Sequence, residues 1–406
     1  MDLFVARQPI FDHDGELSGY ELLYRRGAQS RAADGQSTSQ MSLDVITQSF
    51  LEIGLDRITR GKRAFINFSR DMLLSGCYDL LDPRSVVIEL LEDIELDAAV
   101  GAECERLVRK GYCLALDDYE MESSQAPLLE IASIVKVDVL NRCEEGLAEV
   151  ANALRSHPVR LLAERVETAE VRDACRNAGY ELFQGYFFSR PEVISKKGIS
   201  VEQAAIVQLM NLLRDETVSD QVIEETFRRD PSLSYKLLRM VNAASQGMRG
   251  IESILHAIRV LGRATLHRWL ALLFASSLGG SGGIDNELVH AAVLRARLCE
   301  MLGEAGGQHA TGPLFLVGLF SLMDALLGTP MEELVGKIDL SKEVRAALLD
   351  REGPYARWLR LVEAYEAGEW ETMAGLSASA GISPFEVPEL YLESLSWTRE
   401  KVLSAA

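Results

Sequence analysis

The sequence has few of the features that mark secreted, membrane-spanning or nucleic-acid-binding proteins. Its six cysteines are scattered through 406 residues and none forms a C-x-x-C pair, which predicts buried thiols in a reducing compartment rather than a disulfide framework. The first residues lack the charged and apolar regions of a signal peptide. No run approaches about eighteen uninterrupted apolar residues. These absences predict a soluble, cytoplasmic protein that does not enter a membrane.

Positive charge is also scarce. The chain carries 42 lysines and arginines against 61 aspartates and glutamates, a formal net charge of -19. A phosphate backbone attracts a basic surface, so direct nucleic-acid binding is not expected. A small anionic ligand is compatible with this balance, because it needs only a local arginine or bound metal ions. At this length the chain can form two domains, each with its own core.

The first half alternates short β-branched runs with longer segments of helical spacing. The expected strands cover 64–68, 85–91, 112–117, 133–138, 159–164 and 181–183, with helices such as 97–109 and 144–155 between them. This alternation predicts a parallel sheet, either a closed barrel or an open doubly wound sheet. Nearly every expected strand ends in a carboxylate, an amide or a lysine. A barrel brings such strand ends to one face, so we favour the barrel.

The pattern changes after residue 192. Helical spacing is expected over 201–214, 219–227, 231–242, 253–276, 285–304 and several shorter segments, with glycine-rich turns between them. No strand-like alternation occurs in this half. The sequence therefore predicts an α/β barrel over 1–192, a linker over 193–200 and an all-α domain over 201–406.

Polar residues at the strand ends are the candidates for chemistry. Oxygen ligands suited to Mg²⁺ or Mn²⁺ are offered by Glu21, Asn67, Glu89, Asp117, Asp118 and Glu164. Two such cations can clamp a phosphodiester and activate a water, which Lys136 could orient. The adjacent Asp117 and Asp118 repel each other unless a cation neutralises them. Each residue alone has a simpler explanation, because strand-end acids are often solvated or cap the next helix.

Three motifs in this half resemble those of EAL-domain cyclic-di-GMP phosphodiesterases. They are Arg7-Gln8-Pro9-Ile10-Phe11-Asp12, Gly19-Tyr20-Glu21-Leu22-Leu23-Tyr24-Arg25 and Phe183-Gln184-Gly185-Tyr186-Phe187-Phe188-Ser189-Arg190-Pro191. The resemblance spans residues 1 to about 192. It implies a (β/α)8-type, TIM-like barrel that hydrolyses cyclic-di-GMP to linear pGpG with two Mg²⁺ or Mn²⁺ ions.

The same resemblance assigns roles to individual residues. Glu21 falls on the glutamate of the family signature, and Lys136 falls on the catalytic lysine. The first metal falls to Glu21, Asn67, Glu89 and Asp117, and Asp117 bridges to a second metal completed by Asp118 and Glu164. Residues that engage the nucleotide or order the site are matched by Gln8, Arg25 and Gln184. Supporting acids are matched by Glu92 and Glu167.

One segment departs from the family pattern. After the paired aspartates the family has a Phe-Gly-Thr-Gly-Tyr-Ser-Ser run, whereas this chain reads Tyr119-Glu120-Met121-Glu122-Ser123-Ser124. Both glycines are absent, and glycine permits turns that other residues resist. In the family this loop lies beside the second metal and contributes to a homodimer. The departure therefore bears on turnover and on a possible homodimer, although no metal ligand is lost.

The helical half resembles HDOD domains. The resemblance rests on residues 227–242, where Asp230-Pro231 opens a helix, and on Ile254-Leu255-His256-Ala257-Ile258-Arg259-Val260-Leu261-Gly262. It covers about 201–330 and implies a regulatory module with an unknown protein partner. A metal-dependent phosphohydrolase of the His-Asp type is not expected, because the histidines are dispersed.

Two functions remain open from the sequence. The first is metal-dependent hydrolysis of cyclic-di-GMP, which the complete set of ligands favours. The second is a catalytically degenerate sensor of cyclic-di-GMP or a protein-interaction scaffold, which the altered loop favours.

Overall fold

The protein is described by a computed structural model that forms two compact units. The described residues are 3–26, 54–121, 125–140, 142–185, 201–228, 233–234, 236–237, 253–278, 283–309, 311–327, 329–337 and 340–405. The first unit comprises Met1–Glu192, Gly280–Glu287 and Arg360–Ser396, and the second comprises Val193–Gly279, Leu288–Leu359 and Trp397–Ala406. This division follows compactness alone, so the domain boundaries expected from the sequence stay a prediction.

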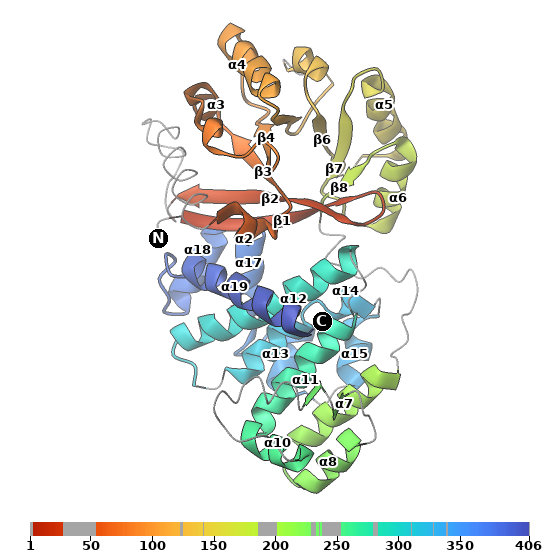
Figure 1. Cartoon of the computed structure of the whole chain (residues 1–406), viewed down its shortest axis with the longest axis vertical. Coiled ribbons are helices and arrows are strands. Elements are labelled where there is room, and N and C mark those ends of the chain that lie inside the picture. Colours follow the sequence, from red (N-terminus) through yellow and green to blue (C-terminus); the bar gives the residue numbers. More distant parts are fainter. Residues whose placement is uncertain are drawn as a thin grey trace. The chain divides into compact units, whose positions relative to one another are not determined.

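The first unit contains a closed barrel of eight strands (Figure 1). The strands are β1 (Leu3–Asp12), β2 (Leu17–Arg26), β3 (Arg63–Phe68), β4 (Val86–Leu90), β5 (Cys113–Leu116), β6 (Ile134–Asp138), β7 (Arg160–Glu164) and β8 (Leu182–Phe183). β1 runs antiparallel to both β2 and β8, and the other neighbours are parallel. The barrel predicted from the sequence is confirmed, with one reversed strand.

The first two strands are absent from the sequence prediction. They form a hairpin whose turn carries Asp14-Gly15, a dipeptide typical of tight turns. Gly15 adopts a φ of 79°, and the Asp12 carboxylate accepts hydrogen bonds from the backbone N–H groups of Asp14 and Glu16. This turn signal could have revealed the hairpin. The six strands that were predicted are all present, with ends that differ by a residue or two.

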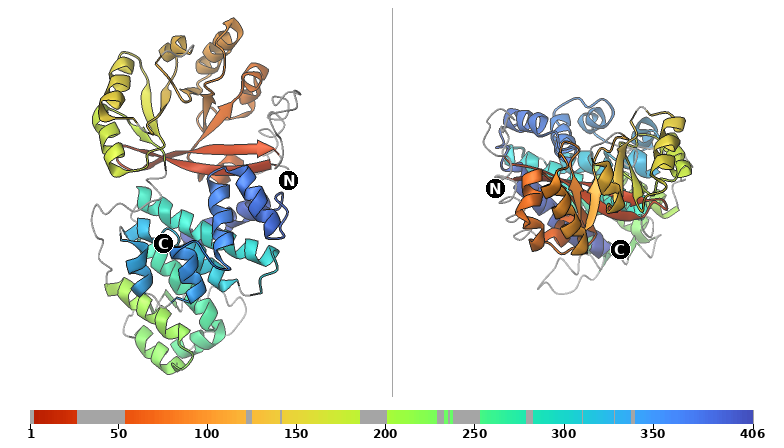
Figure 2. Two further views of the ribbon diagram at one scale, coloured as in Figure 1. Left: turned by 180° about the vertical axis from the view of Figure 1, so that it is seen from behind. Right: turned by 90° about the horizontal axis from the view of Figure 1, so that it is seen from above.

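Helices follow most of the barrel strands and cover their outer side (Figures 1 and 2). They are α2 (Leu55–Thr59), α3 (Arg70–Ser75), α4 (Ala98–Arg109), α5 (Glu144–Leu154) and α6 (Ala169–Ala178). The side chains of Ser69, Asp97 and Thr168 accept hydrogen bonds from N–H groups in the first turns of α3, α4 and α6. Such caps fix where each helix begins after its loop.

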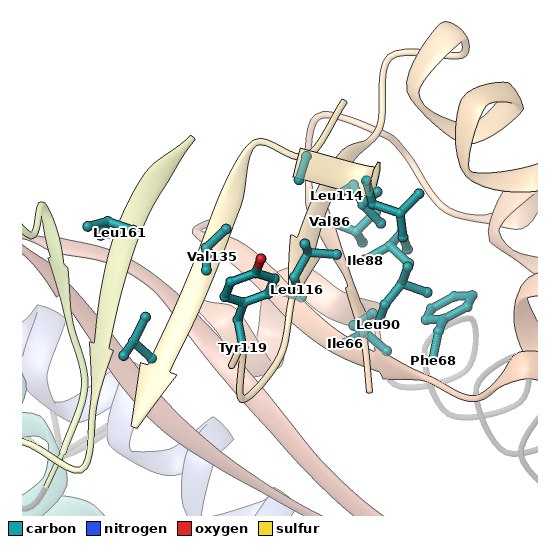
Figure 3. Close-up of a cluster of buried hydrophobic side chains, with 14 of the residues drawn as sticks. Ile66, Phe68, Val86, Ile88, Leu90, Leu114, Leu116, Tyr119, Val135 and Leu161 are labelled. Atoms are coloured by element: carbon teal, nitrogen blue, oxygen red, sulfur yellow. The ribbon is translucent and has the colours of Figure 1, made fainter. Parts of the chain in front are cut away.

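Side chains along the strands alternate between two apolar clusters. The inner cluster fills the barrel and comprises Ile10, Phe65, Val87, Ala115, Ile134, Leu162 and Leu182. Neighbouring positions such as Ile66, Ile88 and Leu116 belong to the larger outer cluster (Figure 3). On β2 the inner position is Gly19, where a Cβ atom would come 2.8 Å from the Phe65 ring. The alternation decides which residues can reach the barrel interior.

Helices from the end of the chain also belong to the first unit. α18 (Trp370–Ser379) lies wholly in it, together with parts of α17 (Ala356–Glu366) and α19 (Val387–Ala405). The ring of Phe4 on β1 lies 5.7 Å from that of Trp370, and the Tyr365 hydroxyl donates to the Val5 carbonyl at 2.9 Å. These contacts help to bury the first residues of β1.

The described part of the second unit is helical. Its elements include α7 (Val201–Arg214), α8 (Asp220–Arg228), α10 (Ile254–Leu261), α11 (Arg263–Leu278), most of α12 (Gly283–Ala305), α13 (Gly312–Phe320), α14 (Met323–Leu327), α15 (Met331–Lys337) and α16 (Lys342–Leu349). The single helix predicted over 253–276 is wrong, because Gly262 ends α10 with a φ of 75°. Most of the helix predicted over 231–242 lies outside the described residues. None of the described helices is long and apolar enough to cross a membrane.

Candidate active site

The period of two along the strands places a ring of polar side chains next to the inner apolar cluster. Two residues after an inner apolar residue, the same face of the strand carries a polar one. The pairs are Phe65 and Asn67, Val87 and Glu89, Ala115 and Asp117, Ile134 and Lys136, Leu162 and Glu164, and Leu182 and Gln184. Glu21 follows Gly19 in the same way, and on the reversed strand β1 Gln8 precedes Ile10. The sequence therefore brings eight polar residues to one level of the barrel.

Lys136 lies at the centre of this ring. Its ammonium nitrogen Nζ lies 2.7 Å from Asp117 Oδ1, 2.9 Å from Glu164 Oε1, 3.0 Å from Glu89 Oε1 and 3.5 Å from Glu21 Oε2. The Lys136 side chain is 1% exposed and that of Glu89 is fully buried. Four carboxylates thus surround one cation inside the protein.

Amide side chains complete the ring on the side of the hairpin. Gln184 donates through Nε2 to Glu21 Oε2 at 2.7 Å and to Gln8 Oε1 at 2.9 Å. Asn67 donates through Nδ2 to the other oxygen of Glu21 at 3.0 Å. Glu21 therefore accepts from two amides in addition to its contact with Lys136, which fixes its orientation.

The charge of Lys136 is maintained by its neighbours. Burial alone lowers the pKa of an ammonium group, because it disfavours the charged form. The negative charges around Lys136 outweigh burial and hold its pKa well above the ordinary value; in order of influence they are Glu89, Glu21, Glu164 and Asp117. The surrounding carboxylates therefore favour the charged form of Lys136.

The pKa values of the carboxyl groups around Lys136 are shifted as well. Burial raises the pKa of Glu89 well above its ordinary value, against the attraction of Lys136. Burial also raises the pKa of Glu164 to about 8 and raises that of Asp117, with Lys136 opposing it in both cases. One ammonium group does not offset four buried carboxyl groups, so further positive charge would stabilise the site.

Several buried oxygens of the ring have no hydrogen-bond donor among the described residues. They are both carboxylate oxygens of Glu89, Asn67 Oδ1 and Gln184 Oε1. Lys136 lies close to Glu89 but outside hydrogen-bond geometry. Unpaired buried acceptors are costly, and carboxylate and amide oxygens are the donor set that Mg²⁺ and Mn²⁺ prefer. The chemistry of these residues fits a hard divalent cation.

The same acids are arranged around the ammonium group of Lys136. Within the described ranges, no three His, Cys, Asp or Glu side chains are arranged to hold a metal ion directly. The ammonium group lies between the carboxylates and takes the central position. A cation and Lys136 would therefore share these oxygens, and the lysine would have to release some of them.

Asp118 lies next to the ring in a second acidic group. Burial raises the pKa of Asp118, and the charges of Glu92 and Asp138 add to this effect. Asp138 pairs with Arg165 at 3.2 Å. Asp118 and Arg165 both have a positive φ, 38° and 54°, a conformation that aspartate tolerates better than most residues. Asp138 was not predicted as a site residue. It lies two residues after Lys136 on β6, and its charge at that position is the only sequence signal that could have indicated it.

Besides Asp118, the two predicted supporting acids are not brought into the ring. Glu92 and Glu167 are exposed, and no contact joins either to Lys136 in the part of the chain that the structure describes. The side chain of Arg25 lies outside the described residues, although its backbone pairs with Phe4. Tyr24, which the sequence did not single out, donates its hydroxyl to the Asn67 carbonyl.

The altered loop begins inside the core. Tyr119 is buried, and its backbone N–H donates to the Lys136 carbonyl at 2.9 Å (Figure 3). Residues 122–124 lie outside the described residues. The first residue of the loop is thus held against the strand that carries Lys136.

Comparison with known families and proteins agrees with the motifs. A model of the EAL domain matches residues 2–191, and a model of the HDOD domain matches residues 202–333. The uncharacterized protein YuxH of Bacillus subtilis (strain 168) is 35% identical over 406 residues and aligns over 98% of both chains.

The cyclic di-GMP phosphodiesterase CdgJ of Vibrio cholerae serotype O1 is 32% identical over 408 residues, which cover 98% of this chain and 92% of the relative. Among solved structures, the PaMucR phosphodiesterase in complex with c-di-GMP aligns with a TM-score of 0.40 and 19% identity. That alignment covers 47% of this chain and 97% of the other.

Proposed function

This chain belongs to the EAL family, with an HDOD domain after the EAL domain, and from that premise we propose that its barrel is a metal-dependent cyclic-di-GMP phosphodiesterase. In this reaction a water oxygen bonds to phosphorus and the ester bond to the 3′ oxygen breaks. The leaving oxygen takes a proton, and the product is linear pGpG.

One observation carries the proposal: the barrel buries four carboxylates around the ammonium of Lys136, and within the described ranges both oxygens of Glu89 lack a hydrogen-bond donor. A protein that used this ring only for stability would be expected to match acceptors with donors. The surplus of acceptors favours divalent cations as the missing partners. Mg²⁺ and Mn²⁺ are the cations we propose.

The ligands we propose are five residues of the ring and the adjacent Asp118. A first cation would be held by Glu21, Asn67, Glu89 and Asp117, and a second by Asp117, Asp118 and Glu164. When bound, such ions neutralise phosphate oxygens and lower the pKa of a bound water. Asn67 and Gln184 hold Glu21 in place for this task.

Lys136 is the residue we propose to act on the attacking water. An ammonium group has three N–H donors, and Lys136 has four carboxylate neighbours. It can therefore give up one carboxylate for a water or phosphate oxygen without being left unpaired. Nucleotide contacts are proposed for Gln8, Arg25 and Gln184, with Arg25 pairing with a phosphate.

The test is a hydrolysis assay of the purified full chain. Cyclic-di-GMP is incubated with the protein and Mg²⁺ or Mn²⁺, and the linear product is followed by chromatography with mass detection. Linear pGpG that appears with metal and not with chelator supports the proposal. Tight nucleotide binding without any product under either metal would contradict it and favour a sensor.

The altered loop is the observation that favours the sensor. Tyr119 is buried against the strand of Lys136, in a segment where the family has glycines. No ring residue is replaced, however, so hydrolysis is the better supported function. For the HDOD half we propose a regulatory or protein-interaction role, and homodimer formation is a further proposal that the same preparation can test by light scattering.

A further inference from the structure

A second buried ion network lies on the opposite face of the hairpin that carries Glu21. Glu287, in the first turns of α12 and part of the first unit, accepts from Tyr20 Oη at 2.8 Å and from Arg60 Nη1 at 2.6 Å through Oε2. Its other oxygen lies 3.7 Å from Arg7 Nη2. The side chains of Glu287 and Arg7 are 8% and 4% exposed. One carboxylate thus joins two strands and the segment after α2.

In the hairpin, residues of this network are adjacent in sequence to residues of the candidate active site. Arg7 and Tyr20 are the direct sequence neighbours of Gln8 and Glu21, and Gln8 pairs directly with Glu21 across the two strands. Because successive side chains point to opposite faces, Arg7 and Tyr20 face outward where Gln8 and Glu21 face inward. A shift of the outer pair must move the inner pair.

The outer network is tightly packed. The Arg7 guanidinium lies 4.3 Å from the centroid of the Tyr20 ring and donates to the Ile58 carbonyl. Loss of the Glu287 charge would remove a counter-ion from a buried guanidinium and a partner from the Tyr20 hydroxyl. Removing one partner from a buried ion network weakens the hold on the remaining groups, and the strands are then expected to adjust.

We propose that Glu287 is a positioning residue for Glu21. Through Tyr20 and Arg7 it fixes the position of β1 and β2. The two strands in turn fix the positions of Glu21 and Gln8 in the ring around Lys136. The functional part of this inference rests on the proposed function, since Glu21 acts there as a metal ligand. The mechanical part rests on the contacts alone.

The chain offers a matched control on the same helix. Glu300 of α12 is also buried between two arginines, Arg268 and Arg297, with 2.7 Å between Glu300 Oε2 and Arg297 Nη1. No barrel strand takes part in that pairing. Glu287→Gln and Glu300→Gln therefore each remove one negative charge from a buried carboxylate that lies between two arginines. They differ in that the carboxylate of Glu287 contacts side chains of β1 and β2, whereas that of Glu300 does not.

The experiment compares both variants with the wild-type full chain by three measurements. Hydrogen exchange reports on the amides of residues 17–26, calorimetry gives the Kd for Mn²⁺ without nucleotide, and steady-state assays give kcat and KM. Both variants should lose thermal stability. In Glu287→Gln we expect at least fivefold faster exchange in β2, at least fivefold weaker Mn²⁺ binding and a lower kcat. In Glu300→Gln all three should stay within twofold of wild type.

Two results would overturn the proposal. Equal exchange of β2 in both variants would show that Glu287 does not hold the hairpin. Faster exchange in Glu287→Gln with unchanged Mn²⁺ affinity and kcat would show that the hairpin does not position Glu21. A wild-type chain that neither binds Mn²⁺ nor hydrolyses the nucleotide overturns the proposed function instead, and the exchange data then decide the mechanical part alone. If Glu287→Gln does not fold, Tyr20→Phe removes one donor to Glu287 and carries the same comparison.

Discussion

Each unit contains an ion network with buried charge, and the two networks have opposite compositions. In the barrel, four carboxylates surround one ammonium group. In the second unit, the single carboxylate of Glu300 lies between the guanidinium groups of Arg268 and Arg297. The first network has more acceptors than its cation can satisfy. The second has two cations for one acid.

The surroundings of the second network explain why its extra positive charge is tolerated. Arg268 stacks over the Phe315 ring at 5.0 Å, and Arg297 over the Trp397 ring at 5.6 Å. Aromatic faces stabilise a cation, so these arginines act as packing elements. The barrel has no comparable aid for its excess of negative charge among the described residues. A surplus of buried acid around one cation indicates a site that binds something, whereas partly exposed arginines stacked on aromatic rings indicate a structural role.

Removal of the central lysine should give the largest effect on this comparison. Lys136→Met is expected to lower kcat by about 10³-fold or more, about 4 kcal/mol, with a smaller change in KM. In chelator its melting temperature should fall, because the four acids lose their cation. Mn²⁺ should then raise the melting temperature more than in wild type, because no ammonium competes for the carboxylates. Thermal melts with and without Mn²⁺ and steady-state kinetics provide the measurements.

The control for that variant comes from the second unit. Arg297→Met also removes one cation, here a partly buried one, from a buried carboxylate, yet its loss of stability should be the same in chelator and in Mn²⁺. If Lys136→Met gained less from Mn²⁺ than wild type does, the idea that lysine and metal share the same oxygens would be wrong.

The next effect in size concerns the carboxylate closest to Lys136. Asp117→Asn keeps the shape of the side chain and removes its charge, so it should lower kcat/KM by about 100-fold, about 2.7 kcal/mol. The Mn²⁺-dependent rise in melting temperature should also be mostly lost. Glu105→Gln, an exposed acid on α4 of the same unit, serves as the control and should change neither quantity. Retention of the full Mn²⁺ effect in Asp117→Asn would argue against Asp117 as a ligand.

The barrel and most of its polar ring were predictable from sequence because two simple rules coincide. Period-two alternation places Glu89 two residues after Val87, and the closed barrel brings those positions together. The central place of Lys136 was not predictable, since it depends on three-dimensional distances between separate strands. The role of the hairpin was missed because its strands were not recognised. Glu287 could not be linked to Tyr20 from a separation of 267 residues.

A smaller effect is expected where the second unit depends on close packing. Gly318 of α13 lies so near α12 that a Cβ atom would meet the Arg295 carbonyl and come 2.6 Å from Ala296 Cα. Gly318→Ala should therefore lower the free energy of unfolding by about 2 kcal/mol and leave the Kd for Mn²⁺ unchanged. Gly375→Ala, inside α18 with open space around it, should be neutral or stabilising by up to about 1 kcal/mol. Urea unfolding of both variants tests this, and equal stability of the two would contradict the packing argument.

An effect of similar size, seen only when the pH is lowered, distinguishes the two units. In the barrel, burial raises the pKa of acids, whereas in α11 burial lowers the pKa of His267 to about 4, with a further contribution from Arg214. Among the described residues, His267 Nε2 has no hydrogen-bond partner. Between about pH 4 and 6.5 the unfolded chain binds a proton at this position that the folded chain does not, so folding stability falls as the pH decreases. From pH 7 to pH 5 this amounts to about 2 kcal/mol.

His267→Gln cannot be protonated and should lose that much less stability over the same interval. The exposed His256→Gln should behave like wild type. With chelator present, the barrel acids titrate equally in all three proteins and cancel in the differences. Urea unfolding at both pH values gives the measurement, and parallel losses in wild type and His267→Gln would show that this partly buried histidine does not set the acid sensitivity of the second unit.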